Sequence, residues 1–206
     1  SDVYKRQLND MSIAWKVAER AQEEGATFTL TNAPIAMRMG AINDLAEKTN
    51  SKVIPADATS VEDLKHLFEK SQEILGGKVD FVLHSIGMSP NVRKKKQYTG
   101  LNYEWYKQTL DVSAMSLHKT LQVAYDMDAL NNWGSVLALT YIAAQRIFPD
   151  YNDMADAKSL LESITRSFGY HYGTAKKVRV NTISQSPTVT TAGSGAVSYT
   201  HLRAHE

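Results

Sequence analysis

The feature that most constrains the fold of this 206-residue chain is a regular alternation of strand-like and helix-like segments. Short runs of β-branched, aromatic and aliphatic residues favour strands, and they recur at residues 27–31, 52–56, 79–87, 134–141 and 177–184. Segments with helical periodicity separate these runs. Strands that alternate with helices in this way predict an α/β fold with a doubly wound parallel sheet of Rossmann type.

Capping and stop residues mark the expected helices. Ser12 is placed to cap a first helix that ends at Gly25, and Ser60 is placed to cap a later helix that ends at Gly76. Further helices are expected over residues 34–48, over a stretch with an apolar stripe of Leu110, Ala114, Leu117, Leu121 and Ala124, and over a stretch that begins at Tyr151 and carries Met154, Leu161, Ile164 and Phe168.

The two ends of the chain do not continue this pattern. Residues 1–7 and 196–206 resemble translated cloning or adapter sequence and are interpreted as non-native scars, with ordinary frayed tails as the alternative. Residues 8–195 are expected to form a single domain. Because the pattern opens at the mouth of a helix, the domain is expected to be truncated at both ends and to lack its first strand and its C-terminal strand.

Composition argues against several classes of function. A net charge of +1 gives no bulk attraction to nucleic acid, and no apolar run is long enough for membrane insertion. With no cysteine, the chain has neither a disulfide framework nor a thiolate metal site. No metal site is expected, and His84 is interpreted as a buried structural residue. A cytoplasmic location is the default expectation, because no secretory signal is recognisable.

Candidate functional residues gather where the expected strands end, which is where doubly wound sheets bind ligands. Residues 85–87 end one strand, Tyr141 ends the next, and residues 186–191 follow the last. Gly87 allows a ligand to approach the backbone closely. Tyr151 and Lys158 are seven residues apart, about two helical turns, so both are expected on nearly the same stripe of one helix.

The Tyr151–Lys158 pair suggests acid–base or oxyanion chemistry. A phenol has an ordinary pKa near 10, and a nearby ammonium group favours the phenolate. It also strengthens the phenol as a hydrogen-bond donor to developing negative charge. Lys158 is placed to bond the ribose hydroxyls of a dinucleotide as well. The alternative is that Tyr151 is a packing residue and Lys158 a solvated one.

A wider set of motifs resembles one enzyme family. HSIG at 84–87, ALTY at 138–141, a second tyrosine ten residues later, a lysine seven further on, and VRVNTIS at 178–184 follow one another in the sequence. Together they resemble bacterial enoyl-acyl-carrier-protein reductases, a divergent branch of the short-chain dehydrogenase/reductase superfamily. The resemblance extends from about Leu8 to Gly195, and ordinary short-chain dehydrogenases space the tyrosine and lysine by four.

The resemblance implies roles for the catalytic residues Tyr151, Lys158 and Tyr141. Tyr151 would bond the thioester carbonyl oxygen of an enoyl substrate and stabilise the enolate. Lys158 would hold the nicotinamide ribose. Tyr141 would line the acyl pocket or assist the proton step, with a plain core role as the alternative. The substrate-binding set that the resemblance implies is Tyr141, Tyr151, Met154, Ala192 and Gly193.

The resemblance also implies a binding site for NADH rather than NADPH. This preference rests on the resemblance alone, because no acidic residue after residues 27–31 is placed to read a ribose 2′-hydroxyl. The implied cofactor set comprises a pyrophosphate pair, an adenine pair, a ribose and nicotinamide strand end, and a carboxamide and phosphate loop: Ser12, Ile13, Asp57, Ala58, Ser85, Ile86, Gly87, Lys158, Pro187, Thr188 and Thr190. The alternatives are that residues 85–87 form a simple strand exit and that Asp57 is a local turn former.

The reaction implied is the reduction of the trans-2 double bond of enoyl-acyl-carrier-protein thioesters in type II fatty-acid biosynthesis. One alternative is another reductase of the superfamily, acting on a carbonyl or alcohol, and another is an inactive dinucleotide-binding fragment. The implied partners are the acyl carrier protein and further copies of the chain, since relatives are commonly tetramers. The basic run 93–96 is either a docking surface for the acidic carrier or merely solvated.

Overall fold

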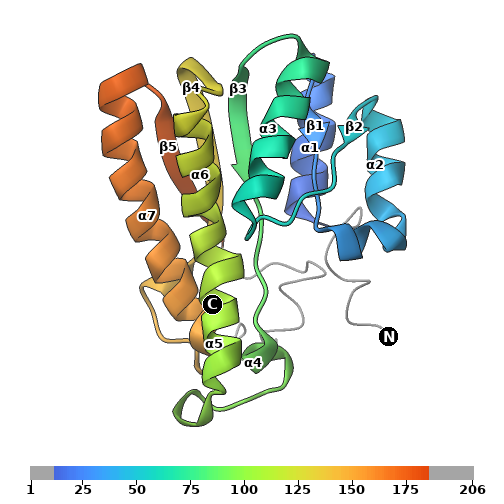
Figure 1. Cartoon of the computed structure of the whole chain (residues 1–206). Coiled ribbons are helices and arrows are strands. Elements are labelled where there is room, and N and C mark those ends of the chain that lie inside the picture. The colour runs from blue at the N-terminus through green and yellow to red at the C-terminus, as the bar shows by residue number, and fades with distance from the viewer. Residues whose placement is uncertain (1–11, 186–206) are drawn as a thin grey trace.

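The computed structural model describes residues 12–185, and it places all of their strands in parallel pairs (Figure 1). One sheet has the order β1-β2 and the other the order β3-β4-β5. The strand bounds are Thr29–Leu30 for β1, Lys52–Val53 for β2, Val79–His84 for β3, Leu130–Tyr141 for β4 and Arg179–Gln185 for β5. The chain therefore has the expected α/β fold with parallel strands.

The helices separate the strands along the chain. Their bounds are Ile13–Glu23 for α1, Ala41–Thr49 for α2, Val61–Leu75 for α3, Pro90–Arg93 for α4, Tyr103–Leu110 for α5, Ser116–Asp126 for α6 and Asn152–Lys176 for α7. Short 3₁₀ turns cover Pro34–Met39, Tyr98–Gly100, Ile142–Ala144 and Pro149–Tyr151, and a π turn covers Asp111–Met115. None of the helices within residues 12–185 is both long and apolar enough to cross a membrane.

The main core lies between the three-stranded sheet and the helices α6 and α7. Figure 1 shows these two helices side by side on one face of that sheet, and α7 contacts both β4 and β5. Residues from helix and sheet are fully buried there, among them Leu117, Leu121, Val136, Ala138 and Leu161. A smaller cluster of Trp15, Ala18 and Leu45 joins α1 to α2. The apolar stripes read from the sequence therefore face the core.

The two sheets are not joined to each other within the described residues. β1 pairs only with β2, and β3 pairs only with β4. The predictions made for residues 1–7 and 196–206 lie outside the described part of the chain.

Several elements differ in extent from the sequence-based expectation. Residues 34–48 do not form one helix, because Gly40 has a left-handed backbone with φ of 76° and separates a 3₁₀ turn from α2. β1 and β2 are shorter than expected. The long helix expected around Leu110 is interrupted by the π turn Asp111–Met115. By contrast, Ser12 and Ser60 cap α1 and α3 as predicted, and Gly76 ends α3.

The buried core predicts that truncation of a core residue and of an exposed apolar residue will lower the free energy of unfolding by very different amounts. Leu161→Ala removes a side chain with 0% exposure and should lower the free energy of unfolding by about 2–5 kcal/mol in urea titrations. Ile147→Ala, at a residue 94% exposed, is the control and should change it by less than about 0.5 kcal/mol. Equal losses in the two variants would contradict the core described here.

Candidate active site

Tyr151 lies just before α7 and not on it. It is the last residue of the 3₁₀ turn Pro149–Tyr151, and Asn152 follows with φ of 44° and ψ of −133°. This left-handed residue turns the backbone between the phenol and the helix. The prediction that Tyr151 and Lys158 share one regular helical stripe is therefore wrong, although Lys158 does lie on α7.

The structure brings Tyr151 together with Tyr141, which ends β4. Their ring centroids are 4.7 Å apart, with an interplanar angle of 42°. Tyr141 also contacts Phe148, at 5.5 Å between centroids. The Tyr141 hydroxyl is buried and finds no hydrogen-bond partner within residues 12–185. A buried hydroxyl without a protein partner is an available donor or acceptor for a ligand.

Lys158 is buried at the carboxyl end of β4. Its Nζ donates a 2.7 Å hydrogen bond to the carbonyl oxygen of Leu139, and only 7% of the residue is exposed. Burial disfavours the charged form and lowers the pKa of Lys158 to about 8. The lysine is therefore not the solvated helix residue of the alternative interpretation.

Gly87, Met154 and Lys158 converge next to this buried amine. A Cβ atom on Gly87 would lie 3.7 Å from Met154 Cε and 3.9 Å from Lys158 Nζ, so any side chain here would extend toward both. Glycine keeps this approach to the backbone open. Gly87 follows β3, with Ser85 exposed and Ile86 half-buried before it. The structure therefore brings together Gly87, which follows β3, and Met154 and Lys158 of α7. Their role at the nicotinamide stays a prediction.

The pKa of Tyr151 is shifted in the direction opposite to the one expected from a nearby ammonium group. Burial raises the pKa of Tyr151 above its ordinary value, and the neighbouring Tyr141 raises it further. The Lys158 ammonium is bonded to the Leu139 carbonyl instead. Tyr151 is therefore a neutral phenol at physiological pH, which suits donation of a hydrogen bond and not proton abstraction.

The π turn Asp111–Met115 holds Met88, the residue after Gly87, and the sequence pattern does not predict this contact. Ser113 Oγ accepts a hydrogen bond from Met88 N at 2.9 Å and donates one to Met88 O at 3.0 Å. Ser116 Oγ lies 2.9 Å from Nε2 of His84. The signal that could have revealed both residues is a pair of serines three apart on an otherwise apolar stripe.

His84 is a buried structural residue, as expected. It is 3% exposed, and burial together with the charge of Lys158 lowers the pKa of His84 to about 3. The imidazole is therefore neutral, and it adds no second positive charge next to Lys158. Among the described residues, no group of histidines and carboxylates is arranged to hold a metal ion.

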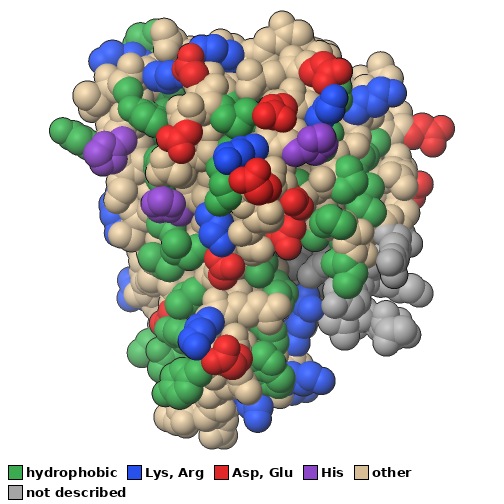
Figure 2. All heavy atoms as spheres, in the orientation of Figure 1, with side chains coloured by type: hydrophobic (Ala, Val, Ile, Leu, Met, Phe, Trp, Pro, Cys, Tyr) green, Lys and Arg blue, Asp and Glu red, His purple; other side chains and the backbone are tan. Residues whose placement is uncertain are grey.

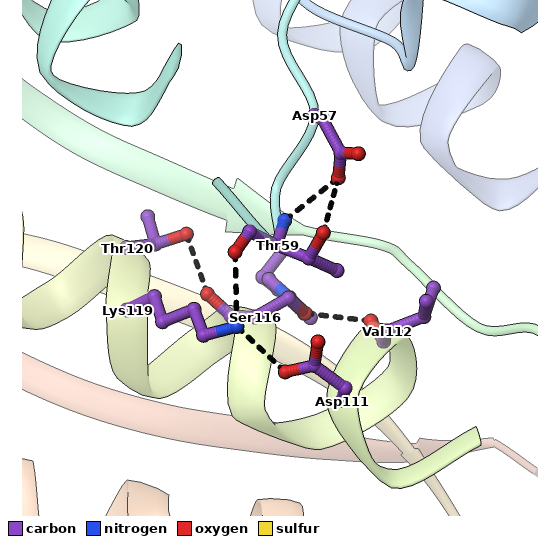
Figure 3. Close-up of polar contacts among 8 residues, drawn as sticks. Asp57, Thr59, Asp111, Val112, Ser116, Lys119 and Thr120 are labelled. Atoms are coloured by element: carbon purple, nitrogen blue, oxygen red, sulfur yellow. Dashed lines mark hydrogen bonds and ion pairs between the residues drawn. The ribbon is translucent and has the colours of Figure 1, made fainter. Parts of the chain in front are cut away.

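Asp57 forms a local turn before α3. Its Oδ1 accepts hydrogen bonds from Thr59 N at 2.8 Å and from Thr59 Oγ1 at 2.7 Å (Figure 3). Lys119 of α6 donates to the Thr59 carbonyl at 2.9 Å and pairs with Asp111 at 2.6 Å, so the turn is attached to α6. This bonding is what the turn-former interpretation predicted. The adenine role of Asp57 and Ala58 stays a prediction.

The remaining cofactor and substrate residues lie on the α1 side or outside the described part. Ser12 Oγ accepts a 3.2 Å hydrogen bond from Trp15 N, and Ile13 begins α1. Their role at the pyrophosphate stays a prediction. The others in the predicted set lie outside residues 12–185: Pro187, Thr188, Thr190, Ala192 and Gly193.

Comparison with known proteins identifies relatives along nearly the whole chain. "Enoyl-[acyl-carrier-protein] reductase [NADH] 2" of Rhizobium meliloti is 32% identical over 190 residues, which cover 91% of this chain and 68% of that protein. The crystal structure of FabI from Alistipes finegoldii superposes with a TM-score of 0.88 at 64% identity, over 90% of this chain and 69% of that one. The FabI–NADH complex from the same organism gives 0.89 at 65% identity, over 91% and 66%.

More distant structures share the same fold. The enoyl-[acyl-carrier-protein] reductase (NADH) of Aquifex aeolicus has a TM-score of 0.82 at 29% identity, over 94% of this chain and 74% of that one. The family model described as "Enoyl-(Acyl carrier protein) reductase" matches residues 8–205. The chain therefore has a Rossmann-type fold and belongs to the enoyl-acyl-carrier-protein reductase family of the short-chain dehydrogenase/reductase superfamily.

Proposed function

We propose that this protein reduces the trans-2 double bond of enoyl-acyl-carrier-protein thioesters in type II fatty-acid biosynthesis, with NADH as the cofactor. Two observations carry the proposal: the buried Lys158 lies next to the open backbone at Gly87, and the Tyr141–Tyr151 pair lies at the end of β4. When bound, NADH supplies the hydride for the β-carbon. The residues of the chain supply position and charge stabilisation.

Tyr151 acts as a hydrogen-bond donor to the thioester carbonyl oxygen. Burial raises the pKa of Tyr151, so its hydroxyl keeps its proton and is available as a donor to the oxygen that gains charge as the enolate forms. A donor that is already positioned stabilises a developing oxyanion without reorganisation. Tyr141 packs against this ring at an angle of 42°, and we assign its buried, unpartnered hydroxyl to the acyl pocket or the proton step.

Lys158 holds the nicotinamide ribose through charge-assisted hydrogen bonds. Its amine is fixed at the Leu139 carbonyl and lies next to Gly87, where backbone can approach the cofactor. Ser12, Ile13, Asp57 and Ala58 are assigned to the pyrophosphate and adenine.

The same assignment extends to residues outside the described part. Pro187, Thr188 and Thr190 are assigned to the carboxamide and phosphates, and Ala192 and Gly193 to the acyl chain together with Met154. These roles are proposed from family membership.

Assembly and location are also proposed from family membership. We expect a homo-oligomer, with a tetramer as the specific expectation, located in the cytoplasm and without a nucleic-acid partner. Light scattering on the purified chain measures its assembly directly.

The oxyanion role predicts a selective loss in Tyr151→Phe. Removal of one positioned donor should lower kcat by about 100-fold or more while the Kd for NADH changes by less than about twofold. The measurement is NADH oxidation with a crotonyl thioester and, for comparison, with a ketone. Tyr103→Phe, at a tyrosine 77% exposed, is the matched control. Near-normal turnover in Tyr151→Phe, or faster reduction of the ketone by the parent chain, would contradict the proposal.

The buried amine predicts that NADH binding depends on pH. Because the pKa of Lys158 is lowered to about 8, its ammonium is mostly charged near pH 7 and mostly neutral near pH 9. The Kd for NADH, measured by calorimetry, should therefore rise by up to about tenfold between these values as the charge-assisted bonds weaken. Lys158→Met should bind weakly at both values. An equal pH dependence in that variant would assign the effect to another group.

The basic segment Arg93–Lys96 is proposed as the docking surface for the acyl carrier protein. Its side chains are exposed, and Asn152 Nδ2 donates to the Lys96 carbonyl, so the segment is fastened to the residue that follows Tyr151. Figure 2 shows Lys and Arg side chains at the lower end of the molecule, where Figure 1 places α4 and α5. Positive charge on this segment complements an acidic carrier.

Charge reversal tests this docking surface. Replacement of Arg93, Lys94, Lys95 and Lys96 by glutamate should raise the KM for carrier-linked substrate by about tenfold or more and leave the KM for crotonyl-coenzyme A within about twofold. Lys65→Glu with Lys70→Glu, on the exposed face of α3, is the control. An unchanged KM for the carrier-linked substrate would remove this segment from the interface.

A further inference from the structure

The first turn of α7 contains a carboxylate that no step of the proposed mechanism uses. Asp153 is 0% exposed, although a carboxylate is costly to bury unless it is hydrogen-bonded. Ser89 Oγ donates to its Oδ1 at 2.6 Å and Asn91 Nδ2 to its Oδ2 at 2.8 Å. Thr109 Oγ1 lies 2.9 Å from Oδ2 and 2.8 Å from the Trp105 carbonyl. Asp153, Ser89, Asn91 and Thr109 form the Asp153 cluster, and all four are buried.

The Asp153 cluster fixes both ends of the loop that follows the nicotinamide side of the site. Ser89 also accepts from Val92 N and so caps α4. Asn91 Oδ1 accepts from Asn102 N at 3.0 Å, and Asn91 Nδ2 donates to Asn102 O at 3.2 Å. The carboxylate of Asp153 therefore joins the start of loop 88–102 to α5 directly, and it reaches the loop's end at Asn102 through Asn91.

The residue between Asp153 and Tyr151 is strained. Asn152 has φ of 44°, a backbone conformation that is unfavourable for a residue with a side chain. Its buried Oδ1 has no hydrogen-bond partner within the described residues, while its Nδ2 donates to the Lys96 carbonyl in the same loop. Such a conformation persists only where its surroundings determine it, and here those surroundings are the loop and the Asp153 cluster.

We propose that Asp153 is a positioning residue: its buried carboxylate clamps loop 88–102 to α7, holds the strained Asn152, and thereby sets the position of Tyr151. Asp153 touches no reacting atom and acts only through Tyr151, so the proposal rests on the function proposed above. A misplacement of about 1 Å in a reacting group costs up to about 100-fold in rate, so a clamp of this kind is a measurable part of the activity.

The decisive experiment compares Asp153→Asn with Asp150→Asn, a carboxylate three residues earlier that is exposed. An amide offers one acceptor oxygen where the carboxylate offers two, and its NH₂ faces donors. We expect kcat for a crotonyl thioester to fall by about tenfold or more in Asp153→Asn, with the KM for NADH within about twofold of the parent. A kcat equal to that of Asp150→Asn would overturn the proposal.

A second pair of variants separates positioning from general damage to the fold. In the Tyr151→Phe background, Asp153→Asn should lower kcat by less than about twofold, because two residues that act through one group are not additive. A full additional tenfold loss, or a rise in the KM for NADH that matches the loss in kcat, would overturn the proposal in favour of a structural role.

The clamp proposed for Asp153 can also be tested by proteolysis, without a measurement of enzyme activity. Trypsin should cleave loop 88–102 at Arg93–Lys96 about tenfold faster in Asp153→Asn than in Asp150→Asn, because loss of the cluster lets the loop open locally. Equal cleavage rates would overturn the clamp. If the parent chain fails to oxidise NADH with a crotonyl thioester, the proposed function fails, and the cleavage ratio alone then decides whether the clamp exists.

Discussion

The burial of Lys158 against the end of β4 is the interaction on which the rest of the site depends. A buried ammonium group is costly, and its hydrogen bond to the Leu139 carbonyl offsets part of that cost while it ties α7 to the sheet. Lys158 is the one positively charged side chain at this point among the neighbours named here. His84 stays neutral, and Gly87 offers no side chain that would separate the amine from a ligand. The result is one localised positive charge beside an open stretch of backbone.

The neutral phenol follows from the same environment. Burial lowers the pKa of Lys158 and raises the pKa of Tyr151. In both residues it therefore favours the neutral form, the amine of Lys158 and the phenol of Tyr151. Positive charge and hydrogen-bond donor thus remain separate functions on two residues. The phenol cannot serve as a base at neutral pH, and the arrangement favours chemistry in which charge develops on the substrate.

Elements that are set by local chemistry could be predicted from the sequence. Ser12 and Ser60 cap their helices through bonds to backbone three residues away, and Gly76 ends α3 in a left-handed conformation. Features that depend on contacts between distant segments could not be predicted. The break at Asn152 depends on Lys96, which is 56 positions away, and the Asp153 cluster joins residues 44 to 64 positions apart. No local pattern encodes such partners, and Asp153 looks like an ordinary first-turn acid.

The loop after Gly87 connects the segments at the start of α6 and of α7. Its first residue, Met88, is held through both backbone atoms by Ser113, which reaches it from the π turn before α6. Its next residues, Ser89 and Asn91, are held by Asp153 at the start of α7. A π turn inserts an extra residue and so redirects the side chains around it. The loop can therefore keep its conformation only while both helices keep theirs, and through Asn152 that conformation is coupled to the position of Tyr151.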